Sequence, residues 1–220
     1  MDFLEIDSIN LSFKGRQVLS DIYLRCQTGD IVGLLGRNGA GKTSLMKIIF
    51  GSLNAQNQSV RFNGKYTHQL FKTLGAINYL PQNGFAMGYF SFYDLIQAFG
   101  LENRVDEFRE IEEIRKNLNQ KMRDLSGGIK RLMEIVTILY TNNSFVILDE
   151  PFSHLSPLLV EKLIPHIKEQ AKFKGIILSD HKYKTVMSVC NKYYLLSSGT
   201  LREIEGEKSL ADYGYIASLT

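Results

Sequence analysis

A glycine-rich loop between an apolar run and a helical pattern is the feature that most limits how this chain can fold. Residues 31–35 predict a buried strand, and the apolar spacing after residue 44 predicts a helix. The loop between them, called the glycine loop below, is Gly36-Arg37-Asn38-Gly39-Ala40-Gly41-Lys42-Thr43, and Ser44 follows it. Its glycines let backbone N–H groups turn toward an anion, and the helix start adds unpaired N–H groups. Residues 36–44 are therefore predicted to bind a polyphosphate, with Lys42 as a positive charge and Thr43 as a hydroxyl ligand of Mg²⁺.

Length and composition favour a single domain around this loop. The 220 residues are 44% hydrophobic and 22% charged, so residues 1–220 can form one globular domain. The net charge of +3 is small and the Lys and Arg residues are scattered, which gives no reason to expect a nucleic-acid partner. Cys26 and Cys190 lie far apart without metal-ligand spacing, so two buried thiols in a reducing compartment are expected.

The beginning of the chain does not resemble a secretion signal. Residues 1–7 are acidic and alternate between polar and apolar side chains. No apolar stretch approaches the roughly 18 residues that a membrane-spanning helix requires. We therefore expect a cytoplasmic protein.

Alternating polar and apolar residues predict an antiparallel β unit in the first part of the chain. The predicted strands of this unit are residues 3–13, 18–25 and 58–62, and the apolar run before Pro81 predicts a separate fourth strand at residues 76–80. Residues 14–16 form the turn of the first hairpin, and Asn63-Gly64 is a turn signal after the third strand. The fourth strand is expected to end at Gln82.

The next part of the chain is predicted to be helical. A helix is expected at residues 93–99, followed by a charged helical stretch at residues 103–119. Residues 84–124 are therefore expected to form a small helical subdomain. It is inserted between the two parts of one core, residues 1–83 and 125–220.

The second half of the chain alternates between helices and apolar runs, as expected for a parallel sheet covered by helices. Ser126 is a natural N-cap for one helix, and Ser156-Pro157 predicts the start of another. Pro165 lies inside that second helix and should kink it or end it early. The further strands are predicted at residues 145–148, 175–181, 193–197 and 201–204. The predicted fold class is α/β.

Chemically active side chains end two of these strands. Asp149 and Glu150 follow residues 145–148, and His181 ends the next apolar run. The carboxyl ends of parallel strands meet at one edge of a sheet, where the glycine loop also lies. Asp149 is then placed to hold Mg²⁺, and Glu150 to orient or deprotonate a water molecule. Because neighbouring residues on a strand point opposite ways, the alternative is that one of the two carboxylates faces solvent without a role.

Leu125-Ser126-Gly127-Gly128, called the signature segment below, carries a family resemblance. It matches the signature motif of ATP-binding cassette (ABC) proteins, which few other phosphate-loop proteins contain. The glycine loop matches the family's Walker A motif, and residues 145–149 match its Walker B strand. The chain thus resembles the nucleotide-binding subunit of an ABC transporter over essentially its whole length. The resemblance implies a P-loop NTPase core with a mixed, mainly parallel sheet, an N-terminal antiparallel β subdomain and a small helical insertion.

The same resemblance implies roles for single residues. Glu150 matches the catalytic glutamate, and Lys42 would contact the reacting phosphates. Gln82 matches the glutamine that reaches Mg²⁺ and the attacking water, and His181 matches the switch histidine. Phe13 aligns with the aromatic residue that stacks on adenine, which a phenylalanine ring can do. Apart from the resemblance, Gln82 is an ordinary loop residue and His181 an ordinary strand-end residue.

Partners and cofactors are implied as well. Two copies, or this chain and a homologous ATP-binding subunit, would pair head to tail, with each ATP and its Mg²⁺ between the glycine loop of one and the signature segment of the other. The signature segment starts a helix of its own, an anion site too far from the glycine loop to share a nucleotide within one chain. Hydrolysis would drive a separate membrane permease that sets the transported substrate. The subunit would then lie at the inner face of the cell membrane.

Two positions depart from the family pattern. Ile129 stands where the family usually has Gln or Glu, so a polar contact beside the nucleotide is missing. Ser156 stands where the family usually has Asp, at the end of a loop that helps to position the attacking water. We therefore expect a working but slow ATPase.

An aromatic-rich segment forms the first part of the helical subdomain. Its large side chains are Phe85, Met87, Tyr89, Phe90, Phe92 and Tyr93. They form either the core of that subdomain or a groove for a cytoplasmic helix of the permease, since exposed aromatic patches commonly mark partner sites.

Two other functions compete with transport. The first is a soluble ABC-type ATPase that acts on DNA or ribosomes. DNA-repair relatives carry a long coiled coil, for which residues 83–125 leave no room, and ribosome-acting relatives carry two cassettes in one chain. The second is a regulator that binds ATP without turnover.

Overall fold

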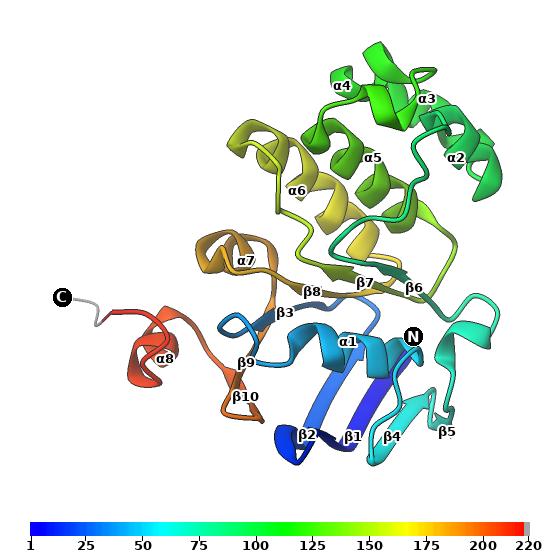
Figure 1. The fold of residues 1–220 in the computed structure, drawn as a ribbon. Helices are drawn as coiled ribbons and strands as arrows, with labels where there is room; N and C mark the ends of the chain where they lie inside the picture. The colour runs from blue at the N-terminus through cyan, green and yellow to red at the C-terminus, as the bar shows by residue number, and fades with distance from the viewer. Residues whose placement is uncertain (218–220) are drawn as a thin grey trace.

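The computed structural model describes residues 1–217, and its central element is a six-stranded sheet in the order β10-β9-β3-β8-β7-β6 (Figure 1). The strands are β3 (Ile31–Leu35), β6 (Ile77–Leu80), β7 (Phe145–Asp149), β8 (Gly175–Ser179), β9 (Lys192–Ser197) and β10 (Thr200–Ile204). All neighbours are parallel except β9 and β10, which form the predicted last hairpin. Every residue of β3, β7 and β8 is buried, as expected for parallel strands covered on both faces. The predicted α/β class with a mixed, mainly parallel sheet is confirmed.

The first part of the chain forms the predicted antiparallel unit, a sheet in the order β2-β1-β4-β5. Its strands are β1 (Phe3–Phe13), β2 (Arg16–Gln27), β4 (Asn57–Phe62) and β5 (Lys65–Tyr66). Lys14-Gly15 and Asn63-Gly64 are two-residue turns with positive φ at both positions, the geometry that matches the twist of a hairpin. Arg16, which the sequence places in the first turn, is instead the first residue of β2.

Helices cover the central sheet on both faces. Figure 1 shows α1 between the two sheets, and α5 and α6 on the opposite side of the central sheet. These helices are α1 (Lys42–Phe50), α5 (Gly127–Tyr140) and α6 (Pro157–Ala171). Ile147 of β7 belongs to the same buried cluster as Ile49 of α1, whereas its neighbour Leu148 belongs to the cluster that contains Leu139 of α5. The alternation of side chains along one strand therefore joins both helical layers to the sheet.

Short helices form a group at the end of the molecule opposite the antiparallel sheet (Figure 1). They are α2 (Phe92–Ala98), α3 (Val105–Arg109), α4 (Glu112–Asn117) and the 3₁₀ turns Glu102–Arg104 and Met122–Asp124. The charged stretch predicted as one helical segment is therefore broken. The break lies at Ile111, whose backbone is extended and whose side chain is buried together with Phe108 and Ile114. Burial of these three apolar side chains overrides the helical pattern.

Several boundaries differ from the predicted ones. Strand β6 ends at Leu80, before Pro81, and not at Gln82. Helix α6 continues past Pro165 to Ala171, so the prediction of an early end is wrong. Pro165 has no N–H to donate to the Glu161 carbonyl, and both residues are exposed, so the missing hydrogen bond lies on the solvent side of the helix. Helical segments without a predicted counterpart are α7 (Tyr183–Val189), α8 (Glu207–Asp212) and the 3₁₀ turn Leu70–Lys72.

Two further predictions concern the cysteines and the absence of a membrane-spanning helix. Cys26 and Cys190 are both free and buried, as predicted, and burial raises the pKa of each thiol. Buried thiols with a raised pKa are weakly reactive, so both cysteines act as packing residues of the core. Among residues 1–217, no helix combines the length and the apolar composition needed to cross a membrane.

Candidate active site

The glycine loop connects β3 to α1, and it requires glycine for two different reasons. Gly39 and Gly41 have φ values of 77° and 107°, a conformation that side chains rarely allow. A Cβ at Gly36 would lie 2.6 Å from the carbonyl oxygen of Leu196, so β9 approaches the loop too closely for any side chain. The sequence-predicted loop is therefore a tightly held backbone turn.

Lys42 is the first residue of α1 and is only 6% exposed. Its Nζ donates hydrogen bonds to the carbonyl oxygens of Gly36, at 2.7 Å, and Arg37, at 3.3 Å. Burial lowers the pKa of this ammonium group, while nearby carboxylates, Glu150 first among them, act in the opposite direction. A bound polyphosphate would place negative charge where this cation is poorly solvated.

Asp149 ends β7 and is completely buried. Two hydroxyls hold its carboxylate: Tyr79 donates to Oδ2 at 2.9 Å, and Ser179 donates to Oδ1 at 2.8 Å. Burial, and then the charge of Asp149, raise the pKa of Tyr79, which therefore stays a neutral donor. Sequence analysis missed Tyr79 and Ser179. Their positions on β6 and β8, which flank β7, provide the only signal that could have identified them.

Glu150 lies beyond the end of β7 and has a φ of 47°, an unusual value for a side-chain-bearing residue. Its Oε2 accepts hydrogen bonds from Nε2 of Gln82, at 2.8 Å, and from Oγ of Ser153, at 3.3 Å. The strand rule that would send one carboxylate to solvent does not apply, because Glu150 is no longer on the strand. Backbone strain of this kind is concentrated at functional sites.

A cavity of about 500 Å³ brings many of the predicted residues together. Its lining contains Phe13, Val18, Asn38, Gly39, Ala40, Gly41, Lys42, Thr43, Ser44, Gln82, Glu150 and His181. Gly36 and Asp149 are buried and do not border this cavity, whereas Arg37 is exposed and lines the wider hollow beside it. Ser126, Gly127 and Gly128 do not border the cavity of their own chain. The structure therefore assembles one half of the predicted site and leaves the signature segment apart from it.

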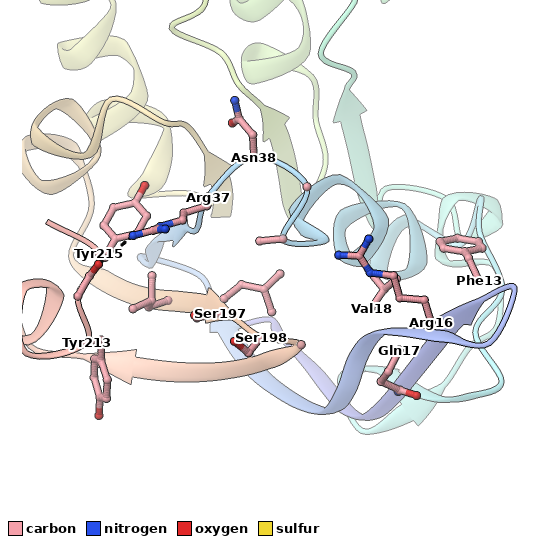
Figure 2. Close-up of a pocket in the computed structure, with 16 residues that line it drawn as sticks. Phe13, Arg16, Gln17, Val18, Arg37, Asn38, Ser197, Ser198, Tyr213 and Tyr215 are labelled. Carbon is pink, nitrogen blue, oxygen red and sulfur yellow. Dashed lines mark hydrogen bonds between the residues drawn. The ribbon is translucent and has the colours of Figure 1, made fainter.

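The glycine loop also borders a wider hollow of about 790 Å³, which Figure 2 shows. Phe13 lies at one end of this hollow and Tyr215 at the other, with the loop between them (Figure 2). Arg37 reaches from the loop to the C-terminal turn, where its Nη2 donates to the carbonyl oxygen of Gly214 at 3.2 Å. Because Phe13 and Val18 line both spaces, the hollow adjoins the smaller cavity.

His181 follows β8, and its half-exposed side chain lines the smaller cavity. Its Nδ1 lies 3.4 Å from Oδ1 of Asp180, a carboxylate that is completely buried. Asp180 also accepts backbone hydrogen bonds from Phe152, at 3.1 Å, and Lys182, at 2.9 Å. This carboxylate connects the loop after Glu150 to the loop that carries His181. Sequence analysis missed Asp180, although it directly precedes the histidine.

The signature segment is an exposed helix start. Ser126 is the N-cap of α5, and its Oγ accepts a hydrogen bond from the backbone N–H of Ile129 at 3.3 Å, as predicted. Ser126 and Gly127 are exposed. A Cβ at Gly128 would lie 3.0 Å from the carbonyl oxygen of His154, so the segment is in close contact with the loop between β7 and α6.

The aromatic-rich segment divides between the two interpretations. Phe92 is completely buried, and Phe85 and Phe90 contact the core of the helical group. Met87, Tyr89 and Tyr93 are 53%, 59% and 38% exposed. The segment therefore supplies part of the core and presents an apolar surface as well.

Comparison with known proteins identifies the family. The sequence model described as ABC transporter matches residues 19–153, which contain the glycine loop, the signature segment and Glu150. The chain belongs to the ABC transporter family. Curated members include the lipopolysaccharide export system ATP-binding protein LptB of Escherichia coli K12, which is 31% identical over 91% of this chain and 89% of its own length. LptB of Haemophilus influenzae is also 31% identical, and the ABC transporter ATP-binding protein YdbJ of Bacillus subtilis is 27% identical over 94% of this chain.

Solved ABC structures share the fold. An ATP-binding cassette of an ABC transporter superposes with a TM-score of 0.84 at 22% identity and covers 99% of this chain and all of its own length. Another ATP-binding subunit gives a TM-score of 0.80 at 22% identity, over 98% of this chain and 95% of its own. The chain is an ATP-binding subunit of an ABC transporter, an ATPase whose activity is coupled to transport.

The oxygen-rich side chains near the glycine loop fit Mg²⁺. Thr43 offers a hydroxyl and Asp149 a carboxylate, and Gln82 donates its amide N–H to Glu150, which leaves the amide oxygen for another partner. Within residues 1–217, no three His, Cys, Asp or Glu side chains form a cluster that could hold a metal alone. Mg²⁺ is usually held by one or two protein oxygens, which Thr43, Gln82 and Asp149 could supply, together with substrate phosphates.

Proposed function

We propose that this ABC subunit binds and hydrolyses MgATP at an interface between two ATP-binding subunits arranged head to tail. Each nucleotide lies between the glycine loop of one subunit and the signature segment of the other, which is a second copy or a homologue. The observation that carries this proposal is the exposure of the signature segment outside its own chain's cavity. Its free N–H groups are an anion site that lacks a nucleotide until a partner brings one.

The proposed binding step uses the cavity of about 500 Å³. Phe13 stacks on the adenine, and the backbone N–H groups of the glycine loop surround the phosphates, while Lys42 contacts the β- and γ-phosphates. Thr43, Gln82 and Asp149 are the proposed oxygen ligands of Mg²⁺. When bound, this ion neutralises charge that develops on the phosphate oxygens.

The proposed chemical step depends on Glu150, which accepts a proton from the attacking water or orients it. The hydrogen bonds from Gln82 and Ser153 fix the direction of this carboxylate. His181 is the proposed donor to the γ-phosphate, and Asp180 beside it holds the ring in one orientation. Loss of the γ-phosphate removes the contact that joins the two subunits, so hydrolysis reopens the dimer.

A Glu150→Gln variant tests this function. It keeps the hydrogen bond to Gln82 but lacks a proton acceptor, so we expect it to bind MgATP, to hydrolyse it at least roughly 100-fold more slowly and to accumulate as a dimer. Analytical ultracentrifugation with and without MgATP measures the dimer, and phosphate release measures turnover. A variant that stays monomeric with MgATP would contradict the head-to-tail arrangement. Equal hydrolysis by the variant and the wild type would contradict the role of Glu150.

We further propose that Met87, Tyr89 and Tyr93 contact the cytoplasmic part of the permease, which holds the subunit at the inner face of the membrane. The exposure of these three side chains beside the ordered core of the helical group supports this surface. Tyr89→Ala and Tyr93→Ala should reduce copurification of the permease at unchanged thermal stability. Tyr66→Ala, at an equally exposed tyrosine of β5, is the matched control. Equal loss of the permease in all three variants would exclude a specific surface.

A further inference from the structure

Arg131 connects the signature helix to the two strand ends that carry catalytic residues. It lies on α5, one turn after the signature segment, and is only 3% exposed. Its Nη1 donates to the carbonyl oxygen of Pro81 at 2.8 Å, and its Nη2 donates to the carbonyl oxygens of Asp149, at 2.7 Å, and Glu150, at 3.1 Å. Pro81 directly precedes Gln82. One guanidinium group therefore holds the backbone on both sides of the Gln82–Glu150 hydrogen bond.

Glu134 makes the corresponding contact from the next turn of α5. It is 2% exposed, and its Oε1 accepts hydrogen bonds from the backbone N–H groups of Phe85, at 3.0 Å, and Ala86, at 2.9 Å. Gly84 has a φ of 73°, and a Cβ there would lie 2.4 Å from the Glu134 carboxylate. Only glycine lets the loop close over this carboxylate. Oε2 of Glu134 lies 3.7 Å from Nη1 of Arg131, so the two side chains form a buried ion pair.

A buried ion pair of this kind is a poor way to stabilise a fold. Two charges lose their hydration, and apolar residues of similar volume often stabilise a core as well or better. The structure shows the cost, because Nε of Arg131 is buried without a hydrogen-bond partner and burial lowers the pKa of the guanidinium. The pair instead fixes the position of the backbone, because both side chains hydrogen-bond to backbone atoms of the two loops beside the site.

We propose that Arg131 and Glu134 are positioning residues that keep Gln82 and Glu150 in register with the signature helix. When the signature segment binds the partner's nucleotide, these contacts make the position of Glu150, the general base of the same chain, depend on the position of α5. This inference rests on the proposed function, because it needs one ATP at the signature segment and another at the glycine loop of the same chain. It adds residues that touch neither the nucleotide nor the attacking water.

Two conservative variants separate positioning from stability. Arg131→Lys keeps the charge but lacks the planar fork that reaches both strand ends. Glu134→Gln keeps the shape and the Oε1 acceptor but removes the charge that faces Arg131. We expect kcat to fall about tenfold in Arg131→Lys and about fivefold in Glu134→Gln, with the KM for ATP within twofold, because the glycine loop is untouched. Hydrogen exchange of residues 82–88 should become faster in both variants.

Glu113→Gln is the matched control. Glu113 accepts a hydrogen bond from Lys162 between α4 and α6, an ion pair that contacts neither loop. We expect this variant to keep the wild-type kcat and the wild-type exchange of residues 82–88. If Arg131 and Glu134 had a merely structural role, Arg131→Lys and Glu134→Gln would lower the melting temperature while leaving kcat unchanged.

The outcomes for this inference and for the proposed function are distinct. The positioning role is overturned if the wild-type protein hydrolyses ATP and both Arg131→Lys and Glu134→Gln keep the full kcat. A rise in KM that accounts for the whole loss of kcat/KM overturns it too. Absence of turnover in the wild-type protein refutes the proposed function instead, and hydrogen exchange of residues 82–88 then decides whether the pair holds the loop.

Discussion

The two halves of the proposed nucleotide site that this chain contributes are built in opposite ways. On the glycine-loop side, Lys42 follows β3 through the loop and is 6% exposed, and Asp149 is the completely buried last residue of β7. On the signature side, Ser126 and Gly127 are exposed at the start of one helix. The first half consists of side chains that the core positions, and the second half consists mainly of backbone N–H groups that face outward.

This difference teaches which part of the function each half can perform alone. The glycine-loop half is complete within one chain, so it should bind a nucleotide before any partner arrives. In the proposed head-to-tail arrangement, the signature half contacts only the partner's nucleotide, so it would act only in an assembled dimer. Substitutions in the two halves should therefore separate nucleotide affinity from turnover.

Removal of the buried cation should have the largest effect. Lys42→Ala leaves the phosphates without the charge-assisted contact of a poorly solvated ammonium, and we expect ATP affinity to fall roughly 100-fold. Lys47→Ala, an exposed lysine five residues along α1, is the control and should bind normally. Isothermal titration calorimetry on the monomer measures both. Wild-type affinity in Lys42→Ala would mean that the backbone loop alone binds the phosphates.

A substitution in the signature half should instead lower turnover and leave ATP affinity unchanged. Ser126→Ala removes a helix cap, which costs about 1 kcal/mol of stability, and removes a hydroxyl from the partner's nucleotide. We expect ATP affinity of the monomer to stay constant and turnover to fall about tenfold, since only the dimer uses this hydroxyl. Ser91→Ala removes the equivalent cap of α2, where Ser91 accepts from the N–H of Asp94 at 3.1 Å. The same loss of turnover in both variants would reduce the role of Ser126 to capping.

Much of the glycine-loop half could be predicted because its chemistry is local in sequence. The loop, the Asp149-Glu150 pair and the strand before His181 each combine a motif with an apolar run, and the structure places them at one sheet edge. The roles of these residues remain predictions. The strand rule failed at Glu150, because a positive φ turns the backbone just beyond β7. Such strain depends on neighbouring strands and has no local signature.

The contacts that hold the site could not be predicted, because they join distant segments. Tyr79 and Ser179 meet Asp149 only after β6, β7 and β8 are aligned. Arg131 and Glu134 look like ordinary polar residues of an amphipathic helix until the fold buries them. The break at Ile111 and the uninterrupted helix at Pro165 likewise depend on burial and exposure in the folded chain.

A smaller effect is expected from restoring the family's polar residue in the signature half. Ile129 is partly buried against the core, so Ile129→Gln should keep much of that contact through its methylene groups while adding an amide beside the partner's nucleotide. One added hydrogen bond is worth about 0.5–1.5 kcal/mol, and we expect turnover to rise about threefold at unchanged ATP affinity. Ile129→Leu is the control without an amide. Slower turnover in Ile129→Gln would show that this subunit needs the apolar contact.

The smallest effect, a gradual one, should appear in the pH dependence of binding. Burial lowers the pKa of Lys42, so this lysine loses its charge at a lower pH than an ordinary one. Bound phosphates favour the charged form, so ATP affinity should be full below the pKa of the free site and should decline as the pH rises above it. The unfolding free energy should change in the opposite sense, because above that pKa the unfolded chain binds more protons than the folded one.

Calorimetry in two buffers of different ionisation enthalpy measures this linkage, since binding at alkaline pH must take up a proton. Lys42→Met has no titrating group at this position, so it should bind weakly and without the alkaline decline. Ser126→Ala retains Lys42 and should show the wild-type pH dependence at every pH tested. An alkaline decline of the same size in Lys42→Met would assign the titration to another group, and the buried cation would then cease to distinguish the two halves of the site.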